Sequence, residues 1–123
     1  MLSAKNIRRE EAANLLRTLT PDKAFYFYKA IGQPLGTTSR SFSEFAAAVK
    51  GIDPSSVRFH VERGDFEGWF RMLGDKSLAD QIAALRGKNL TPDELRSKVS
   101  SMVGARVDEL GKIAGSKVKA RRS

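Results

Sequence analysis

Residues 59–70 read FHVERGDFEGWF, a stretch with the only histidine, the only tryptophan and three of the seven phenylalanines in the chain. Gly64 has the conformational freedom to end one helix, and Asp65 can cap the next by accepting a backbone N–H bond. Phe66, Trp69 and Phe70 then share one face of the second helix, because their spacing is i, i+3 and i+4. The stretch therefore predicts two consecutive helices whose aromatic face lies at the centre of the core.

Capping signals and apolar periodicity predict helices along most of the remaining chain. Ser41 with Glu44, and Thr91 with Glu94, match the capping box that starts a helix. We therefore expect an all-α fold, a compact single domain formed by residues 1–111. It would contain six or seven short helices, which we place near residues 6–19, 42–50, 54–63, 65–73, 78–86 and 92–114.

Residues 21–31 fit both a helix and a strand. The run FYFY at residues 25–28 is rich in strand-forming residues. Thr20, Pro21 and Gly32, however, are suited to cap, begin and end a helix. We favour the helix because the chain offers no second convincing strand to pair with this one, and we interpret residues 32–39 as a loop.

Composition limits the classes of protein to which the chain can belong. Its 123 residues fit one domain, and 29% charged with 41% hydrophobic residues is ordinary for a soluble globular protein. The absence of cysteine excludes disulfides, thiolate zinc sites and thiol nucleophiles, and fits a reducing cytosol. Residues 1–5 (MLSAK) lack the apolar core of a secretory signal, and the longest apolar run, residues 45–49, is too short for a membrane span. We expect a cytoplasmic protein with no membrane partner.

Positive charge is concentrated at the C-terminus. The net charge is +8, and residues 112–123 hold five basic residues and no acidic ones, whereas residues 20–111 hold 13 basic and 12 acidic residues. Beyond Gly115 the apolar periodicity stops, which predicts a basic, disordered C-terminal tail over residues 112–123.

The tail suggests a nucleoid-associated protein that binds nucleic acid, DNA rather than RNA, mainly through electrostatic and sequence-tolerant phosphate contacts. A solubilising tail is the alternative interpretation. The residues expected to bind are Lys112, Lys117, Lys119, Arg121 and Arg122, with Arg8, Arg9, Arg96 and Lys98 as secondary candidates. Lys98 and Arg96 would belong to the second helix of a loose helix-turn-helix, whose turn is longer than usual.

Several motifs resemble those of an archaeal family of small uncharacterised proteins. They are FYFY at residues 25–28 with Gly32 and Gly36, SFSEF at 41–45, FHVERGDFEGW at 59–69, and LGD at 73–75 followed by Leu78-Ala79. The resemblance covers roughly residues 24–86. It implies an archaeal, cytoplasmic protein with a shared compact fold, and it implies no known activity. The basic tail lies outside these motifs.

Little in the sequence points to catalysis, so we expect no enzyme, no cofactor and no metal site. His60 with Glu62, Asp65 and Glu67 could be drawn as a metal site, but one histidine without cysteine is poor material for zinc. We interpret His60 as a hydrogen-bonded structural residue, and the carboxylates as a helix cap and surface ion-pair partners.

Two further hypotheses use the aromatic residues. Tyr26 and Tyr28, beside Lys29, could present rings and charge to single-stranded nucleic acid, or could be half-buried core residues. Alternatively, the helical domain could be a protein–protein interaction module, for which an exposed Trp69 would be the strongest contact residue.

Overall fold

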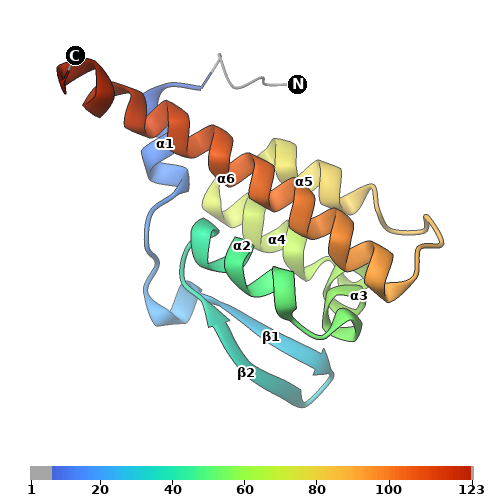
Figure 1. Cartoon of the computed structure of the whole chain (residues 1–123). Coiled ribbons are helices and arrows are strands. Elements are labelled where there is room, and N and C mark those ends of the chain that lie inside the picture. The colour runs from blue at the N-terminus through green and yellow to red at the C-terminus, as the bar shows by residue number, and fades with distance from the viewer. Residues whose placement is uncertain (1–6, 123) are drawn as a thin grey trace.

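The computed structural model describes the backbone of residues 7–122 and the side chains of residues 7–115. Figure 1 shows the long helix α6 lying across the other helices, with a β-hairpin on the far side of α2. The elements are α1 (Arg9–Leu15), the 3-10 turn η2 (Pro21–Lys23), β1 (Phe25–Ala30), β2 (Gln33–Ser39), α2 (Phe42–Gly51), α3 (Pro54–Arg63), α4 (Asp65–Leu73), α5 (Lys76–Ala83) and α6 (Pro92–Arg122).

The fold is α+β, so the all-α prediction is wrong. Strands β1 and β2 pair as a two-stranded antiparallel sheet, with Phe25 opposite Ser39 and Ala30 opposite Gln33. Gly32 forms the turn with a φ of 74°, and Gly36 has a φ of 79° on β2, whose pairing with β1 is irregular in register. Residues 33–39 therefore combine strand pairing with the Pro and Gly content of a loop, which is why the sequence pattern concealed the second strand.

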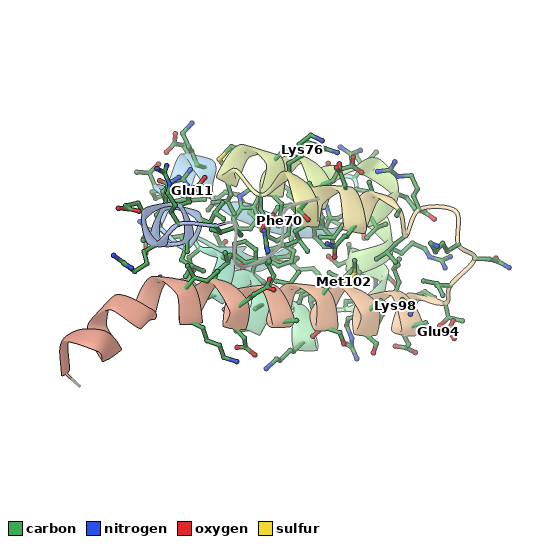
Figure 2. All side chains as sticks on the ribbon, turned by 90° about the horizontal axis from the view of Figure 1, so that it is seen from above. Glu11, Phe70, Lys76, Glu94, Lys98 and Met102 are labelled. Carbon is green, nitrogen blue, oxygen red and sulfur yellow. The ribbon has the colours of Figure 1, made fainter. Side chains whose placement is uncertain are left out.

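The aromatic core forms where the hairpin meets α2 and α4. Along β1 the side chains alternate, so that Phe25 and Phe27 are buried and Tyr26 between them is exposed. Phe45 of α2 is fully buried, and its ring packs with those of five residues, Phe25, Phe27, Phe66, Trp69 and Phe70. Figure 2 shows Phe70 in the interior, whereas Lys76 and Glu11 lie at the surface. The predicted aromatic face is thus the centre of the core.

The joint between α3 and α4 is a single residue. Gly64 has a φ of 80°, and its N–H donates to the carbonyls of His60 and Val61 at the end of α3. The same residue is the N-cap of α4, where no side chain caps the helix. The prediction that Asp65 caps α4 is therefore wrong, since Asp65 is the first residue of that helix and its carboxylate bonds elsewhere.

Helix α6 continues to Arg122. Residues 112–122 therefore extend a helix, and the prediction of a disordered tail is wrong for their backbone. Figure 1 shows this end of α6 projecting past α1 and away from the body of the molecule. The basic segment is thus carried on a helical arm.

A buried ion pair ties α6 to the start of α5. Arg106 contacts both carboxylate oxygens of Asp75, at 2.6 Å through Nε and 3.0 Å through Nη2. The side chain of Asp75 is 1% exposed, and its carboxylate also accepts the N–H of Leu78 and so caps α5. Arg106 is therefore a structural residue of the core and cannot contact a nucleic acid as it stands.

We predict that Phe45→Ala lowers the free energy of unfolding by about 3–5 kcal/mol, the usual loss for a buried aromatic ring. Urea denaturation followed by Trp69 fluorescence measures this loss. Ile31→Ala is the control, because Ile31 is 79% exposed and its truncation should change stability by no more than about 0.5 kcal/mol. Equal losses in the two variants would contradict the packing described.

Arg106→Met should cost about 3–5 kcal/mol, because it leaves the carboxylate of Asp75 buried without its partner. Adding Asp75→Asn to the same chain removes the stranded charge while keeping an oxygen that can cap α5. The double variant should therefore recover part of the loss in urea denaturation. A double variant less stable than the single one would show that the buried charge is not the cause.

Candidate functional site

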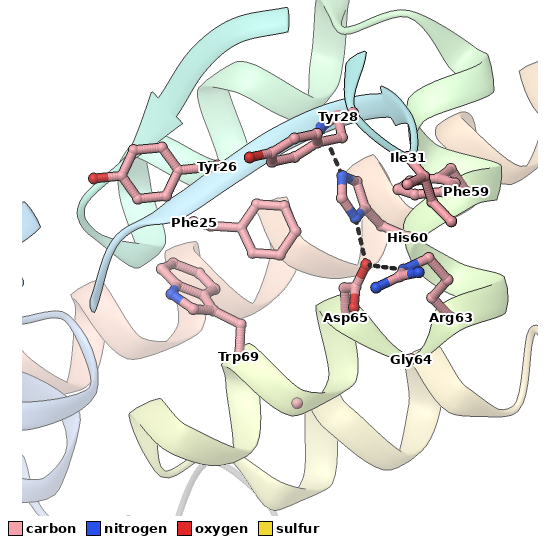
Figure 3. Close-up of a pocket in the computed structure, with 12 residues that line it drawn as sticks. Phe25, Tyr26, Tyr28, Ile31, Phe59, His60, Arg63, Gly64, Asp65 and Trp69 are labelled. Atoms are coloured by element: carbon pink, nitrogen blue, oxygen red, sulfur yellow. Dashed lines mark hydrogen bonds and ion pairs between the residues drawn. The ribbon is translucent and has the colours of Figure 1, made fainter. Parts of the chain in front are cut away.

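An open cavity of about 670 Å³ lies between the hairpin and the joint of α3 and α4. This volume is within the range of about 300–1,000 Å³ that is typical of small-molecule sites. Figure 3 shows rings from β1, α3 and α4 arranged around it. The aromatic residues that line the cavity are Phe25, Tyr26, Tyr28, Phe59 and Trp69.

His60 joins the three elements that enclose this cavity. Its Nε2 accepts the backbone N–H of Tyr28 on β1 at 2.8 Å, and its Nδ1 lies 2.8 Å from Oδ2 of Asp65 on α4. Because Nε2 is an acceptor, Nδ1 must carry the proton and donate it to the carboxylate. With 3% of the side chain exposed and both nitrogens bonded, His60 is the hydrogen-bonded structural residue that the sequence predicted.

Burial sets the charge of this histidine. Desolvation lowers the pKa of His60 below its ordinary value, and the positive charge of Arg63 acts in the same direction. The hydrogen bond and the negative charge of Asp65 oppose the shift without cancelling it. His60 is therefore neutral at neutral pH, as its acceptor role toward Tyr28 requires.

An arginine and an aspartate form the polar rim of the cavity. Arg63 Nε donates to Asp65 Oδ2 at 3.1 Å, and the guanidinium carbon of Arg63 lies 5.1 Å from the ring centre of Phe59. Among residues 7–115, the second oxygen of Asp65 and the Nη groups of Arg63 make no hydrogen bond or ion pair. The charges of Arg63 and Asp65 therefore cancel at the rim, and the two side chains still offer one hydrogen-bond acceptor and several donors to a ligand.

Trp69 is not available as an exposed contact residue. It is 7% exposed, and its Nε1 donates to the carbonyl of Lys23 at 2.9 Å. The exposed apolar residues near this cavity belong to the hairpin instead, with Ile31 at 79% and Tyr26 at 47%. The protein-interaction hypothesis thus loses its strongest candidate contact residue.

The residues predicted to bind nucleic acid separate into two groups. Helix α1 packs against α6, and Figure 1 places it beside the C-terminal part of α6. Arg8 and Arg9, both exposed at the start of α1, therefore belong to the same end of the molecule as exposed Lys112. Four of the predicted residues, Lys117, Lys119, Arg121 and Arg122, continue α6, and their side chains lie outside the described ones.

Arg96 and Lys98 lie at the other end of α6. Arg96 and Lys112 are 16 positions apart in the chain, which corresponds to about 24 Å along a helix. Figure 2 shows Lys98 near the start of α6, far from Glu11 on α1. Arg96 also donates to the carbonyl of Ile52 at 2.8 Å. These two residues do not form one surface with the basic arm.

Within the part of the chain that the structure describes, no three histidine, aspartate or glutamate side chains come together in a way that could hold a metal ion. Nor is any described helix both long and apolar enough to cross a membrane. The aromatic cavity is a candidate binding site in the described body. The sequence does not predict this cavity because one of its walls is the hairpin, although the pattern does indicate Tyr26 and Tyr28 as candidate binding residues.

The chain belongs to a known protein family. The model of the family of unknown function DUF5752 matches residues 5–104. No curated protein and no solved structure matches the chain. The matched range contains every residue that lines the aromatic cavity and ends before the basic segment 112–122.

The lowered pKa of His60 makes stability depend on pH. As the pH falls, the unfolded chain takes up the histidine proton first, near pH 6.5, while the folded protein resists it. Folding stability should therefore fall with pH below about 6.5, by up to about 1.4 kcal/mol per pH unit. Urea denaturation at several values between pH 7.5 and 5.5 measures this slope.

His60→Asn is the matched variant, because asparagine does not titrate. It should be less stable throughout and should show a flatter dependence on pH than the unaltered protein. Identical slopes in the two proteins would mean that another group causes the loss.

Proposed function

We propose that this protein binds nucleic acid, duplex DNA in preference to RNA, through the basic C-terminal end of α6. The observation that carries the proposal is the position of the charge. Five basic residues and no acidic one occupy residues 112–122, on a helix that projects from a body with nearly balanced charge.

The helical backbone of residues 112–122 supports this proposal. Residues 112–122 cover about 15 Å along a helix axis, so the charge is dense enough to replace several phosphate counterions at once. Arg8 and Arg9, at the start of α1, lie at the same end of the molecule, where Glu10 and Glu11 oppose their charge and Arg8 pairs with Glu11. Contacts of this kind bind the phosphate backbone and carry no sequence information directly.

The hydrogen bonds of His60 favour a binding protein over an enzyme. The one histidine bonds through both ring nitrogens, so it lacks a free nitrogen for general-base catalysis. The archaeal origin and the location at a cytoplasmic nucleoid, both expected from the sequence, remain part of this proposal.

Gel shifts with duplex DNA across a salt series test the proposal. Five phosphate contacts predict a slope of about −4.5 for log K against log salt concentration. Replacing Lys117, Lys119, Arg121 and Arg122 together by glutamine should reduce the size of this slope by about 3.6, because each neutralised phosphate contributes about 0.9 to it.

The control variant replaces the exposed Lys23, Lys50, Lys76 and Lys88 of the body by glutamine. It removes the same charge from the body and leaves the arm intact, so its slope should stay close to that of the unaltered protein. The proposal is wrong if the two variants bind alike, or if the unaltered protein shows no salt-dependent binding. Repeating the series with duplex RNA tests the preference for DNA.

A further inference from the structure

The aromatic cavity is separate from the basic arm and has its own chemistry. Its walls are aromatic, and its rim is an ion pair whose charges cancel. A singly charged ligand would find no net opposite charge there, because His60 is neutral and Arg63 is already paired with Asp65. The cavity therefore favours a neutral occupant.

The free polar atoms at the rim indicate which kind of neutral ligand the cavity can bind. Asp65 presents one carboxylate oxygen that accepts, and Arg63 presents Nη groups that donate. Tyr28 lines the same space and carries a hydroxyl that can do both. A flat ring with neighbouring donor and acceptor atoms on its edge would match both the walls and the rim.

We propose that this cavity binds a nucleobase, which stacks on the aromatic walls and hydrogen-bonds to Asp65 and Arg63 through its edge. Bases stack on aromatic side chains and are recognised through hydrogen bonds to their exposed edges in just this combination. The site is independent of the arm, since it lies on β1, α3 and α4. Its occupant is a free nucleoside or an unpaired base of a strand.

Gly68 provides a precise way to close the cavity. It lies within α4 and lines the cavity, and a Cβ built on it would meet nothing within 4 Å. A larger side chain can therefore enter the open space without displacing the core. Gly51, in the last position of α2, has equally free surroundings outside the cavity, so Gly51→Leu is the matched control for Gly68→Leu.

The experiment is an NMR titration of the full chain with adenosine, cytidine and uridine, read from the indole N–H of Trp69 and the amides of Tyr28 and Gly68. At least one nucleoside should shift these signals in a saturable way. Gly68→Leu should weaken that binding about fivefold or more, since the stacking of one base is worth at least about that factor. Gly51→Leu should leave it unchanged.

Further probes distinguish a free nucleoside from an unpaired base of a strand, and a nucleobase from an aromatic peptide side chain. An unpaired oligonucleotide that binds more than about tenfold tighter than its nucleoside, and still responds to Gly68→Leu, identifies a strand as the source. Equal affinity identifies the free nucleoside. The proposal is overturned if no nucleoside binds, if Gly68→Leu binds as well as Gly51→Leu, or if only N-acetylphenylalaninamide, a neutral peptide mimic, shifts the signals. Because arm and cavity variants differ, failure here leaves the arm proposal standing.

Discussion

The imidazole of His60 is the interaction on which the arrangement of the hairpin depends. A two-stranded sheet is marginal by itself in water, and a bare backbone N–H beside the core would be costly. His60 accepts the N–H of Tyr28 and donates to Asp65, so one neutral ring links β1 to the first turn of α4. This link also explains why Gly64 must end α3 so sharply. The left-handed turn at Gly64 starts α4 at once and places Asp65 beside the ring.

The position of the ring has a consequence for the cavity. The acceptor role of Nε2 requires a neutral imidazole, and burial favours that form. Because the ring is neutral, Arg63 and Asp65 are the charged pair of the rim, and the charges of their side chains neutralise each other. The interaction that fixes the hairpin therefore also leaves the cavity without net charge. The hydrogen bonds of His60 thus account for both the position of the hairpin and the neutral rim of the cavity.

Local signals in the sequence predicted the helices well and the hairpin badly, for physical reasons. The start of α2 follows from Ser41, whose side chain caps the helix as expected, and the side chain of Asp53 caps α3 in the same way. The sequence favours a helix in place of β1 because it offers no second convincing strand: β2 contains Pro34 and Gly36, which local propensity assigns to a loop. What stabilises β2 is its pairing with β1, and that pairing is not visible in local sequence. The cavity could not be predicted for the same reason, although its tyrosines, its histidine and its aspartate could each be named.

The family model matches one of the two candidate binding regions and not the other. Residues 5–104 include the hairpin, His60, the α3–α4 joint and the whole lining of the cavity, whereas the basic arm begins after this range. The cavity thus lies within the part of the chain that the family model matches, and the arm extends beyond that part along α6. A helix tolerates such an extension well, because cations in its last turn interact favourably with the carbonyl ends of the backbone dipoles. Positive charge can therefore be added at this end without altering the core.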